Sequence, residues 1–514
     1  MRSMALTLRA AFCCFLATVA IGSAQTSTAP PLSCSTQTLE PAIWQLNGQS
    51  EPVPDIVIKC QGGTAGGRFL GNVQVFFGSG KATDGAEPLL LIDEPAPSGR
   101  VTGQNTFTGR KVADNSVAFL GVTFLAPGQG SQRTLRISGL KVNLAGVKGT
   151  ESGAQPTRVL AAIVFTNASS VPLQMAPDRF YMSVGVVLPD PSLCLITGTV
   201  RDENGTGVSA PGVKATGLGG DSPWSSYYGV YALPAPCGYS GTVTAVPTDL
   251  IYEPPTRSYS AIRSHQRGQD FKVLMPRVKA VVNAASYENK LAPGGLISVF
   301  IENFKPPATR PSGVPLPNEL AGVRLILRGP PMGSSSLTAP LVFVGPSGYD
   351  GLAQVNAQIP YEVPEGRLIF DAPVYGLYSR SFQIDVLPAA PGILLHSGNR
   401  AVAQNPDYSL NSPQAPAKPG SVATVYLTGI GKLDGTLGSG QPAPTDRLLA
   451  AALPASATVG GKPARLGFLG LTPGFVGLAQ ANIELPDLAA GDHEVVITVG
   501  GVTSNSGLLA VGGN

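Results

Sequence analysis

The chain has 514 residues, of which 43% are hydrophobic and only 13% are charged, with a net charge of +3. A single hydrophobic core rarely extends beyond about 300 residues, so this length predicts several domains. The charge argues against a nucleic-acid-binding protein, because displacing counterions from phosphates needs clustered cations and no run of Lys and Arg occurs. Glycine (63 residues) and proline (47 residues) alternate with segments rich in Val, Thr, Leu and Ile, which is typical of short strands joined by tight turns.

The N-terminus has the pattern of an export signal. Arg2 and Arg9 accompany a short apolar segment, residues 10–21, and small residues follow at 22–24. This pattern predicts a signal peptide over residues 1–24, because the apolar run is shorter than the ~20 residues that span a bilayer. An uncleaved anchor is the alternative. We expect a mature chain without a transmembrane segment, exported through the general secretory route and either secreted or held at the cell surface.

Four cysteines remain after this signal: Cys34, Cys60, Cys194 and Cys237. An even number of cysteines in an exported chain predicts two disulfides, for which three pairings are possible. We favour Cys34–Cys60 with Cys194–Cys237, because each bond then closes within one predicted domain. A metal site on these cysteines is not expected, since no Cys-x-x-Cys occurs.

The segment 34–188 alternates strand-like runs with turns. Residues 55–60 (DIVIKC), 72–78 (NVQVFFG) and 116–126 (SVAFLGVTFLA) are separated by Gly- and Pro-containing turns, and no stretch shows a sustained helical period. The pattern predicts an N-terminal β-sandwich over residues 34–188.

A second unit is predicted over residues 194–274. Its segments also alternate, and Asn204-Gly205 is a strong hairpin signal because both residues tolerate positive φ. The unit resembles the carboxypeptidase regulatory-like family, whose fold is a small prealbumin-type sandwich. The matching residues are Gly198, Val200, Asp202 to Gly205, Gly229, Tyr231, Gly238 to Thr244, Tyr252 to Pro254, Tyr259 and Asp270-Phe271. The resemblance implies a non-catalytic appendage of an exported protein.

The C-terminal half contains a duplication. GYDGLAQVNAQIP begins at Gly348 and GFVGLAQANIELP at Gly474, an offset of 126 residues. PGGLISVFIENF begins at Pro293 and PGSVATVYLTGI at Pro419, which is the same offset of 126. Two separated matches at one offset predict two copies of one unit.

We place these copies at residues 277–388 and 389–514 and expect each to be an immunoglobulin-like sandwich, since both read as alternating strands between turns. The pair resembles the Solibacter-type C-terminal domain, an acidobacterial family of exported modules. The residues that carry this resemblance are Asn283 to Ser286, Pro293-Gly294, Gln354 to Asn356, Ile359-Pro360, Ala390 to Gly392, Asn405, Asn411, Pro419-Gly420, Val459 to Gly461, Pro473 to Phe475 and Gln480 to Asn482. Ile301 departs from the pattern, which usually has Gly there. The resemblance implies a fold and an exported location, and no activity.

Candidate catalytic groups are few. Histidine, the commonest proton carrier near neutral pH, occurs only as His265, His396 and His493. No His-Glu-x-x-His, Gly-x-Ser-x-Gly or P-loop spacing is present, and the Gly-Lys of residues 77–83 is followed by Ala82 where a P-loop has Ser or Thr. We therefore predict no enzymatic activity, no cofactor and no metal.

The acidic pairs Asp93-Glu94 and Asp202-Glu203 are sequence neighbours, so in an extended strand their side chains point to opposite faces. That geometry does not clamp one glycosidic bond between two carboxylates. We interpret these acids as solvated turn residues, and Asp202 to Gly205 as a hairpin turn rather than a calcium site.

Two further groups are candidates for binding. The cluster WSSYYGVY (224–231) offers Trp224 and Tyr228 as aromatic rings that stack on sugars, although part of the cluster must face a core. Gln354 with Asn356, and Gln480 with Asn482, share a strand face in each copy, and we interpret these amides as structural groups that bind loop backbone. A ligand site made twice is the alternative.

These features predict an exported, non-catalytic, all-β protein of four tandem sandwiches, with a role in adhesion, matrix formation or polysaccharide binding. Polysaccharides and cell-envelope components are the expected partners. An extracellular hydrolase, or its accessory subunit, with a hidden site in 34–188 is the alternative. In a third hypothesis, residues 277–514 sort the chain or attach it to the surface.

Overall fold

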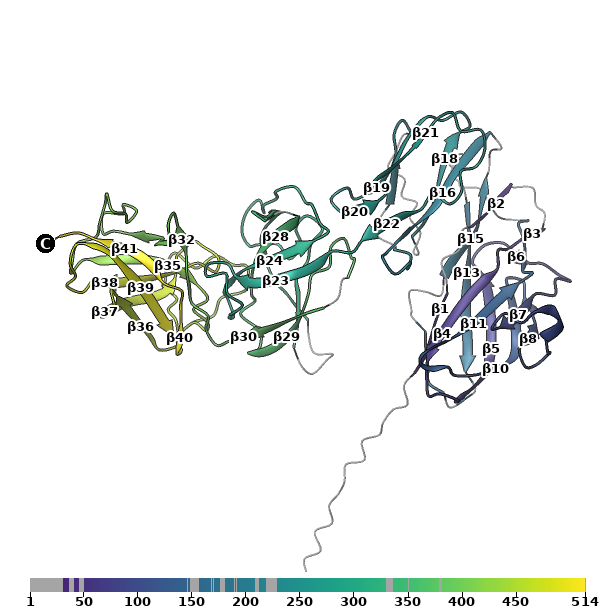
Figure 1. Ribbon diagram of the computed structural model, residues 1–514, viewed down its shortest axis with the longest axis horizontal. Helices are drawn as coiled ribbons and strands as arrows, with labels where there is room; N and C mark the ends of the chain where they lie inside the picture. Colours follow the sequence, from purple (N-terminus) through teal and green to yellow (C-terminus); the bar gives the residue numbers. More distant parts are fainter. Residues whose placement is uncertain are drawn as a thin grey trace, which may run out of the picture.

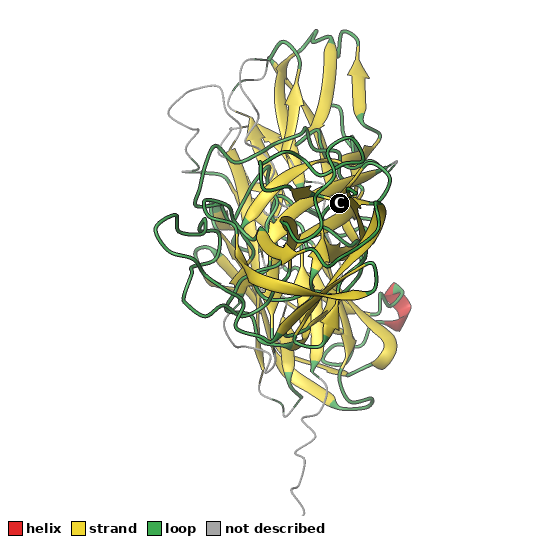
Figure 2. Ribbon diagram, turned by 90° about the vertical axis from the view of Figure 1, so that its left-hand side faces the viewer, coloured by secondary structure: helices red, strands yellow, loops and turns green. Residues whose placement is uncertain are grey.

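The protein is all-β in the computed structural model (Figures 1 and 2). The structure describes residues 31–36, 41–45, 50–145, 147, 157–167, 169, 171–175, 181–188, 190, 192–208, 212–218, 229–329, 336–349, 351–378 and 381–513. Within these ranges the chain forms strands and one short 3-10 turn, Pro97–Gly99, which confirms the predicted fold class. The predicted signal peptide, residues 1–24, lies outside the described residues.

The N-terminal unit contains two six-stranded sheets and one small sheet. The first has the order β14-β1-β4-β11-β7-β8, formed by β1 (Leu32–Thr36), β4 (Ile56–Gly62), β7 (Leu89–Ile92), β8 (Thr106–Thr108), β11 (Gly128–Ser138) and β14 (Leu173–Met175). The second has the order β2-β15-β13-β5-β10-β9, formed by β2 (Ala42–Gln45), β5 (Arg68–Phe77), β9 (Arg110–Ala113), β10 (Ser116–Leu125), β13 (Thr157–Asn167) and β15 (Tyr181–Leu188). The small sheet joins β3 (Ser50–Pro52), β12 (Lys141–Asn143) and β6 (Lys81–Ala82).

Alternating apolar side chains of both large sheets fill the core of this unit. On β5, Phe69, Gly71, Val73, Val75 and Phe77 are buried while the residues between them are at least partly exposed. This period of two follows from the opposite orientation of successive side chains in a strand.

The second unit has a four-stranded and a three-stranded sheet. The four-stranded sheet, β18-β16-β22-β20, is formed by β16 (Leu193–Arg201), β18 (Val230–Pro236), β20 (Ile251–Glu253) and β22 (Phe271–Leu274). The three-stranded sheet, β17-β19-β21, is formed by β17 (Gly212–Ala215), β19 (Gly241–Val246) and β21 (Thr256–Tyr259).

The third unit has two four-stranded sheets. One is β23-β24-β28-β27, formed by β23 (Arg277–Asn283), β24 (Leu296–Glu302), β27 (Leu341–Pro346) and β28 (Leu352–Gln358). The other is β26-β25-β29-β30, formed by β25 (Ile326–Arg328), β26 (Leu337–Thr338), β29 (Gly366–Asp371) and β30 (Phe382–Val386).

The fourth unit forms one 11-stranded sheet. Its strands are β31 (Gly392–Ile393), β32 (Leu395–His396), β33 (Arg400–Ala401), β34 (Ala403–Gln404), β35 (Val422–Thr428), β36 (Ala455–Val459), β37 (Lys462–Leu471), β38 (Ala479–Glu484), β39 (Gly491–Val499), β40 (Val502–Thr503) and β41 (Gly507–Val511).

The third and fourth units pair their strands in the same register. Ser298 on β24 lies opposite Asn356 on β28, and Thr424 on β35 lies opposite Asn482 on β38, with both residues displaced by the offset of 126 found in the sequence. A register shift follows on the next strand in both units, between Leu341 and Phe343 in one and between Leu466 and Phe468 in the other. The duplicated sequence therefore folds into duplicated sheets.

Proline explains one difference between these two units. The long strand β37 continues from β38 to β36 and so joins both halves of the fourth unit. The corresponding stretch of the third unit is split into β26 and β27, with Pro340 between them. Proline lacks the N–H that a continuous strand would donate, so the two sheets of the third unit remain separate.

The units follow one another along the molecule (Figure 1). The N-terminal unit and the fourth unit have separate cores, whereas one continuous cluster of buried residues runs through the second and third units. Tyr375 donates a hydrogen bond to Asp249 (2.6 Å) across the boundary of those two units, and the N–H of Lys305 donates to the carbonyl of Asp249 (2.7 Å). Shared burial and these bonds fasten the second unit to the third.

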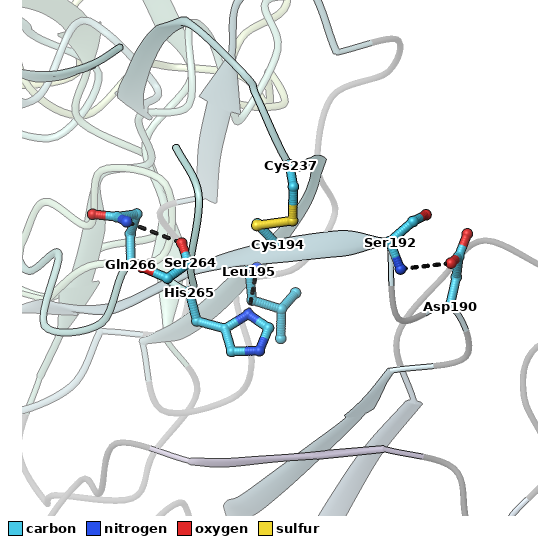
Figure 3. The surroundings of a disulfide bond; sticks show 8 residues. All are labelled: Asp190, Ser192, Cys194, Leu195, Cys237, Ser264, His265 and Gln266. Carbon is cyan, nitrogen blue, oxygen red and sulfur yellow. Dashed lines mark hydrogen bonds between the residues drawn. A yellow bond between two sulfur atoms is a disulfide. The ribbon is translucent and has the colours of Figure 1, made fainter. Parts of the chain in front are cut away.

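Both predicted disulfides are formed. Cys34 and Cys60 lie directly opposite each other on β1 and β4. Cys194 on β16 is bonded to Cys237, which follows β18 (Figure 3). Each disulfide joins two cysteines of the same unit.

Candidate functional site

The aromatic pair proposed from the sequence, Trp224 and Tyr228, lies outside the described residues. The described end of the same cluster faces inward: Tyr231 is fully buried and its hydroxyl donates to the backbone carbonyl of Gln269. Burial raises the pKa of this tyrosine, which therefore stays neutral.

The acidic pairs are occupied by structural contacts. Asp93 pairs with Arg133 and Glu94 with Arg136; both acids directly follow β7, and both arginines lie on the neighbouring strand β11. These two acids therefore contact separate arginines rather than one common position.

The second acidic pair closes a hairpin and bridges two units. Asp202 accepts the N–H groups of Asn204 (2.9 Å) and Thr206 (2.8 Å), which closes the turn, while Glu203 pairs with Arg277. Within the described residues, no three His, Cys, Asp or Glu side chains gather as metal ligands do.

The three histidines lie apart and bind backbone where they have a partner. His265 accepts the N–H of Leu195 (3.1 Å), and Nε2 of His493 lies 2.8 Å from the carbonyl of Ala489. Nε2 of His396 is buried without a hydrogen-bond partner. Lys81, in the Gly-Lys turn, pairs with Asp114 (3.3 Å).

The repeated amides contact a neighbouring strand, not the loop backbone expected from the sequence. Oδ1 of Asn356 accepts the hydroxyl of Ser298 (3.0 Å) and the amide of Gln354 (2.8 Å). The second copy repeats this triad, with Asn482 accepting Thr424 (3.1 Å) and Gln480 (3.4 Å). Both triads link neighbouring strands, and their residues line neither of the two grooves described below.

Gln358, an amide that sequence reasoning missed, does bind loop backbone. Its side chain is fully buried, donates to the carbonyl of Gly294 (3.2 Å) and accepts the N–H of Gly440 (2.7 Å). Nearby, the hydroxyl of Thr428 accepts the N–H of Leu296 (2.8 Å). These contacts join the third unit to the fourth.

A groove of about 710 Å³ lies beside this junction, lined by Pro293, residues 361–365, Pro388, residues 432–433 and residues 435–438. Its one aromatic ring, that of Tyr361, packs directly on the backbone of Gly294. The contact is so close that a Cβ added to this glycine would lie 2.0 Å from the ring. Burial also raises the pKa of Tyr361. The ring face is therefore committed to the junction and is not free to stack on a ligand.

A second groove, of about 460 Å³, lies at the opposite end of the third unit. Phe304, Lys305, Pro306, residues 346–349, Gly351 and Leu352 line it. Tyr349 is 60% exposed, and its ring contacts the buried Phe300 edge-on, with the centroids 5.4 Å apart. An exposed ring beside prolines and a lysine offers an apolar face together with a hydrogen-bond donor, which is the combination that small-ligand sites use.

The turn that carries Tyr349 is locked by hydrogen bonds. The N–H of Tyr349 donates to the hydroxyl of Ser347 (3.0 Å), which donates to the carbonyl of Tyr349 (2.8 Å). The N–H of Ser347 reaches the carbonyl of Leu352 (3.1 Å). Because these bonds fix the backbone at Ser347 and Tyr349, binding has to order only the side chain of Tyr349.

The fourth unit presents an aromatic ring at the same position. Phe475 is displaced from Tyr349 by the repeat offset of 126 and is 56% exposed. A single exposed aromatic side chain is ordinary, but its recurrence at one position of both copies calls for a reason. The signal was present in the sequence, as the aromatic residue before each GLAQ stretch.

The chain matches no protein-family model and no curated protein. Among solved structures, it is similar to SGBP-B of the Bacteroides ovatus mixed-linkage glucan utilization locus, solved with a mixed-linkage heptasaccharide: 12% identity, 59% of this chain, 61% of that one and a TM-score of 0.20. It is also similar to the major pilin subunit BcpA of Bacillus cereus (15% identity, 48% and 69% of the chains, TM-score 0.19). The pilus backbone RrgB of Streptococcus pneumoniae is similar as well, with 10% identity, 47% of this chain and 91% of that one covered, and a TM-score of 0.19. Such low identities and TM-scores carry no inference about function.

Proposed function

We propose that this protein is an exported, non-catalytic binding protein that holds a polysaccharide outside the cytoplasm through exposed aromatic rings on its duplicated immunoglobulin-like units. The observation that carries the proposal is the groove beside Tyr349, together with the matching exposure of Phe475. The C–H face of a pyranose ring is apolar and covers an aromatic ring, while its hydroxyls need donors such as Lys305.

The proposed location rests on the disulfides Cys34–Cys60 and Cys194–Cys237 and on the signal pattern of residues 1–24. Disulfides persist in oxidising compartments and are rare in the cytosol. The described part of the chain contains no helix with the length and hydrophobicity required to cross a membrane. The assignments of 194–274 to the carboxypeptidase regulatory-like family and of 277–514 to the Solibacter-type family are part of this proposal.

The test is binding of the mature chain to a panel of neutral polysaccharides (cellulose, xylan, amylose, dextran and β-1,3-glucan), measured by pull-down and affinity electrophoresis. We expect retention by at least one polymer. Tyr349→Ala should weaken that retention about tenfold, since the loss of one aromatic contact of about 1.4 kcal/mol is a tenfold change in affinity. No retention of the wild-type chain by any polymer would refute the proposal.

Tyr378→Ala is the matched control. Tyr378 is 58% exposed on the same unit but does not line the groove. Both variants should keep the melting temperature of the wild type, because neither ring is buried. Equal loss of binding in both variants would contradict a site at Tyr349.

A further inference from the structure

Two exposed tyrosines, Tyr287 and Tyr408, occupy matching loops of the duplicated units. Tyr287 follows β23, whose residues Val281 and Val282 pair with Val299 and Ser298. Tyr408 follows β34, whose residues Ala403 and Gln404 pair with the counterparts of those two partners, Val425 and Thr424. The two loops therefore leave the same strand position in each copy.

Each loop is closed in the same way by a buried asparagine. In the third unit, Asn283 is 3% exposed, its carbonyl accepts the N–H of Tyr287 (3.0 Å) and its N–H donates to Glu288 (2.8 Å). In the fourth unit, Asn405 is 8% exposed, its carbonyl accepts the N–H of Tyr408 (2.9 Å) and its N–H donates to Ser409 (2.9 Å). Both tyrosines are held on rigid loops.

Both tyrosines also have left-handed backbones, with φ of 59° at Tyr287 and 65° at Tyr408. A non-glycine residue in this conformation loses about 1–2 kcal/mol relative to the right-handed regions, and Asn or Gly would avoid most of that loss. Burial of the ring does not offset it, since Tyr287 is 53% exposed and Tyr408 is 83% exposed. Within the described chain, neither hydroxyl has a hydrogen bond to protein. Stability alone therefore does not explain a tyrosine at these positions.

We infer that Tyr287 and Tyr408 are two further contact points for one extended, neutral polysaccharide chain, an inference that rests on the proposed function. Tyrosine presents a large, rigid, amphipathic ring with little rotamer entropy to lose. Because the two loops lie at equivalent places on successive units, only an extended polymer reaches both.

The charges beside the rings favour a neutral polymer over an anionic one. Asp407 precedes Tyr408, and the hydroxyl and N–H of Ser409 lower the pKa of this carboxyl, which is therefore ionised near neutral pH. Glu288 follows Tyr287 and pairs with Lys290 (2.8 Å). The carboxylate of Asp407 accepts hydrogen bonds from sugar hydroxyls and repels uronate or sulfate groups, while the Glu288–Lys290 pair adds no net charge beside Tyr287.

The test replaces each tyrosine by the residue best suited to a left-handed backbone. Tyr287→Asn and Tyr408→Asn should keep or slightly raise the melting temperature, because asparagine tolerates this conformation. Each should weaken binding to the polysaccharide that retains the wild-type chain by about tenfold, since contacts along one polymer combine by avidity. A hexasaccharide of the same polymer should bind at the groove beside Tyr349 alone, so its binding should change less than about twofold in either variant.

Tyr378→Asn is the control, since this exposed tyrosine has no aromatic counterpart in the fourth unit. Strand β30 begins at Phe382 and the corresponding strand β41 at Gly507, an offset of 125 residues. At this offset the residue of the fourth unit that corresponds to Tyr378 is Thr503. If the wild-type chain binds a polymer and both loop variants bind it equally well, this inference is wrong while the proposed function stands. If the wild-type chain binds no polymer, both the proposed function and this inference are wrong.

Discussion

The side chain of Gln358 accepts a hydrogen bond of 2.7 Å from the backbone N–H of Gly440, which lies in the fourth unit. The same side chain donates to Gly294 within its own unit (3.2 Å). One buried amide thus satisfies two backbone groups on either side of the junction. Because a buried polar group without a partner is costly, this contact specifies how the third and fourth units meet.

Replacing Gln358 by alanine should therefore loosen the junction. Gln358→Ala leaves the N–H of Gly440 and the carbonyl of Gly294 without partners, and we expect a loss of about 1–3 kcal/mol in the free energy of unfolding. Urea unfolding followed by far-UV circular dichroism measures this loss in the free energy of unfolding. Glu484, the residue displaced from Gln358 by the repeat offset of 126, is the control. It forms a surface ion pair with Arg465, so Glu484→Ala should lose less than about 1 kcal/mol. Equal losses at both positions would contradict the special role of the buried amide.

The cross-strand triads predict a stability difference between the two copies. Asn356→Ala removes the acceptor of Ser298, which is 1% exposed, and so leaves the proton of a buried hydroxyl without an acceptor. Asn482→Ala removes the acceptor of Thr424, which is only partly buried. We expect losses near 1–2 kcal/mol at Asn356 and smaller ones at Asn482, read as shifts in melting temperature.

The same variants separate a structural role from a ligand role for these amides. Polysaccharide binding should survive in both, once measured below their melting temperatures. Loss of binding with an unchanged melting temperature would make Asn356 and Asn482 ligand groups, against the contacts seen here.

His265 predicts a dependence of stability on pH. Its Nδ1 accepts the N–H of Leu195, which requires the neutral ring, and Figure 3 shows the ring on the opposite side of β16 from the disulfide. Burial, with a further contribution from Arg267, lowers the pKa of His265 below its ordinary value of 6.5. The folded state therefore binds a proton less readily than the unfolded state. Its contribution to stability is fully present above pH 6.5 and is lost as the pH falls through the lower, folded pKa.

Urea unfolding at steps from pH 8 to pH 5 checks this prediction. In the wild type, the free energy of unfolding should decrease below pH 6.5. His265→Gln keeps an acceptor that does not titrate, so its decrease over the same interval should be smaller. An identical slope in both proteins would show that another group carries the dependence.

The shared core of the second and third units predicts that damage in one spreads to the other. Cys194→Ser with Cys237→Ser removes a bond that closes 43 residues, which typically lowers the free energy of unfolding by about 2–5 kcal/mol. Because buried residues run continuously from β16 to β30, hydrogen exchange should accelerate on β28 as well as on β16. The matched pair Cys34→Ser with Cys60→Ser, in the separate core of the N-terminal unit, should leave β28 protected.

Local patterns were enough to predict much of this architecture. Alternation along residues 72–78 is visible without any partner strand, because successive side chains of a strand point to opposite faces. The two disulfides were predicted from the even number of cysteines and from pairing within one unit. The duplication was predicted from the constant offset of 126 residues between the repeated stretches. Each of these signals lies in composition, spacing or short-range order.

The candidate site was harder to predict, because exposure depends on neighbouring units. Trp224 and Tyr228 stood out as a dense aromatic cluster, yet the described Tyr231 at its end is buried. Tyr349 and Phe475 occupy the same position of the two repeats, but the residues around them do not indicate whether their rings are exposed or buried.

The sequence by itself determined the strands, the two disulfides and the duplication, since periodicity and spacing encode them directly. Only the tertiary structure decided which equivalent positions differ in role. Gln358 is buried because the fourth unit covers that end of the third, whereas Glu484, at the same strand position of the fourth unit, pairs on the surface with Arg465. The left-handed backbones of Tyr287 and Tyr408 likewise depend on buried asparagines that close their loops. Burial and backbone strain are properties of packed neighbours, and a chain read one residue at a time does not contain them.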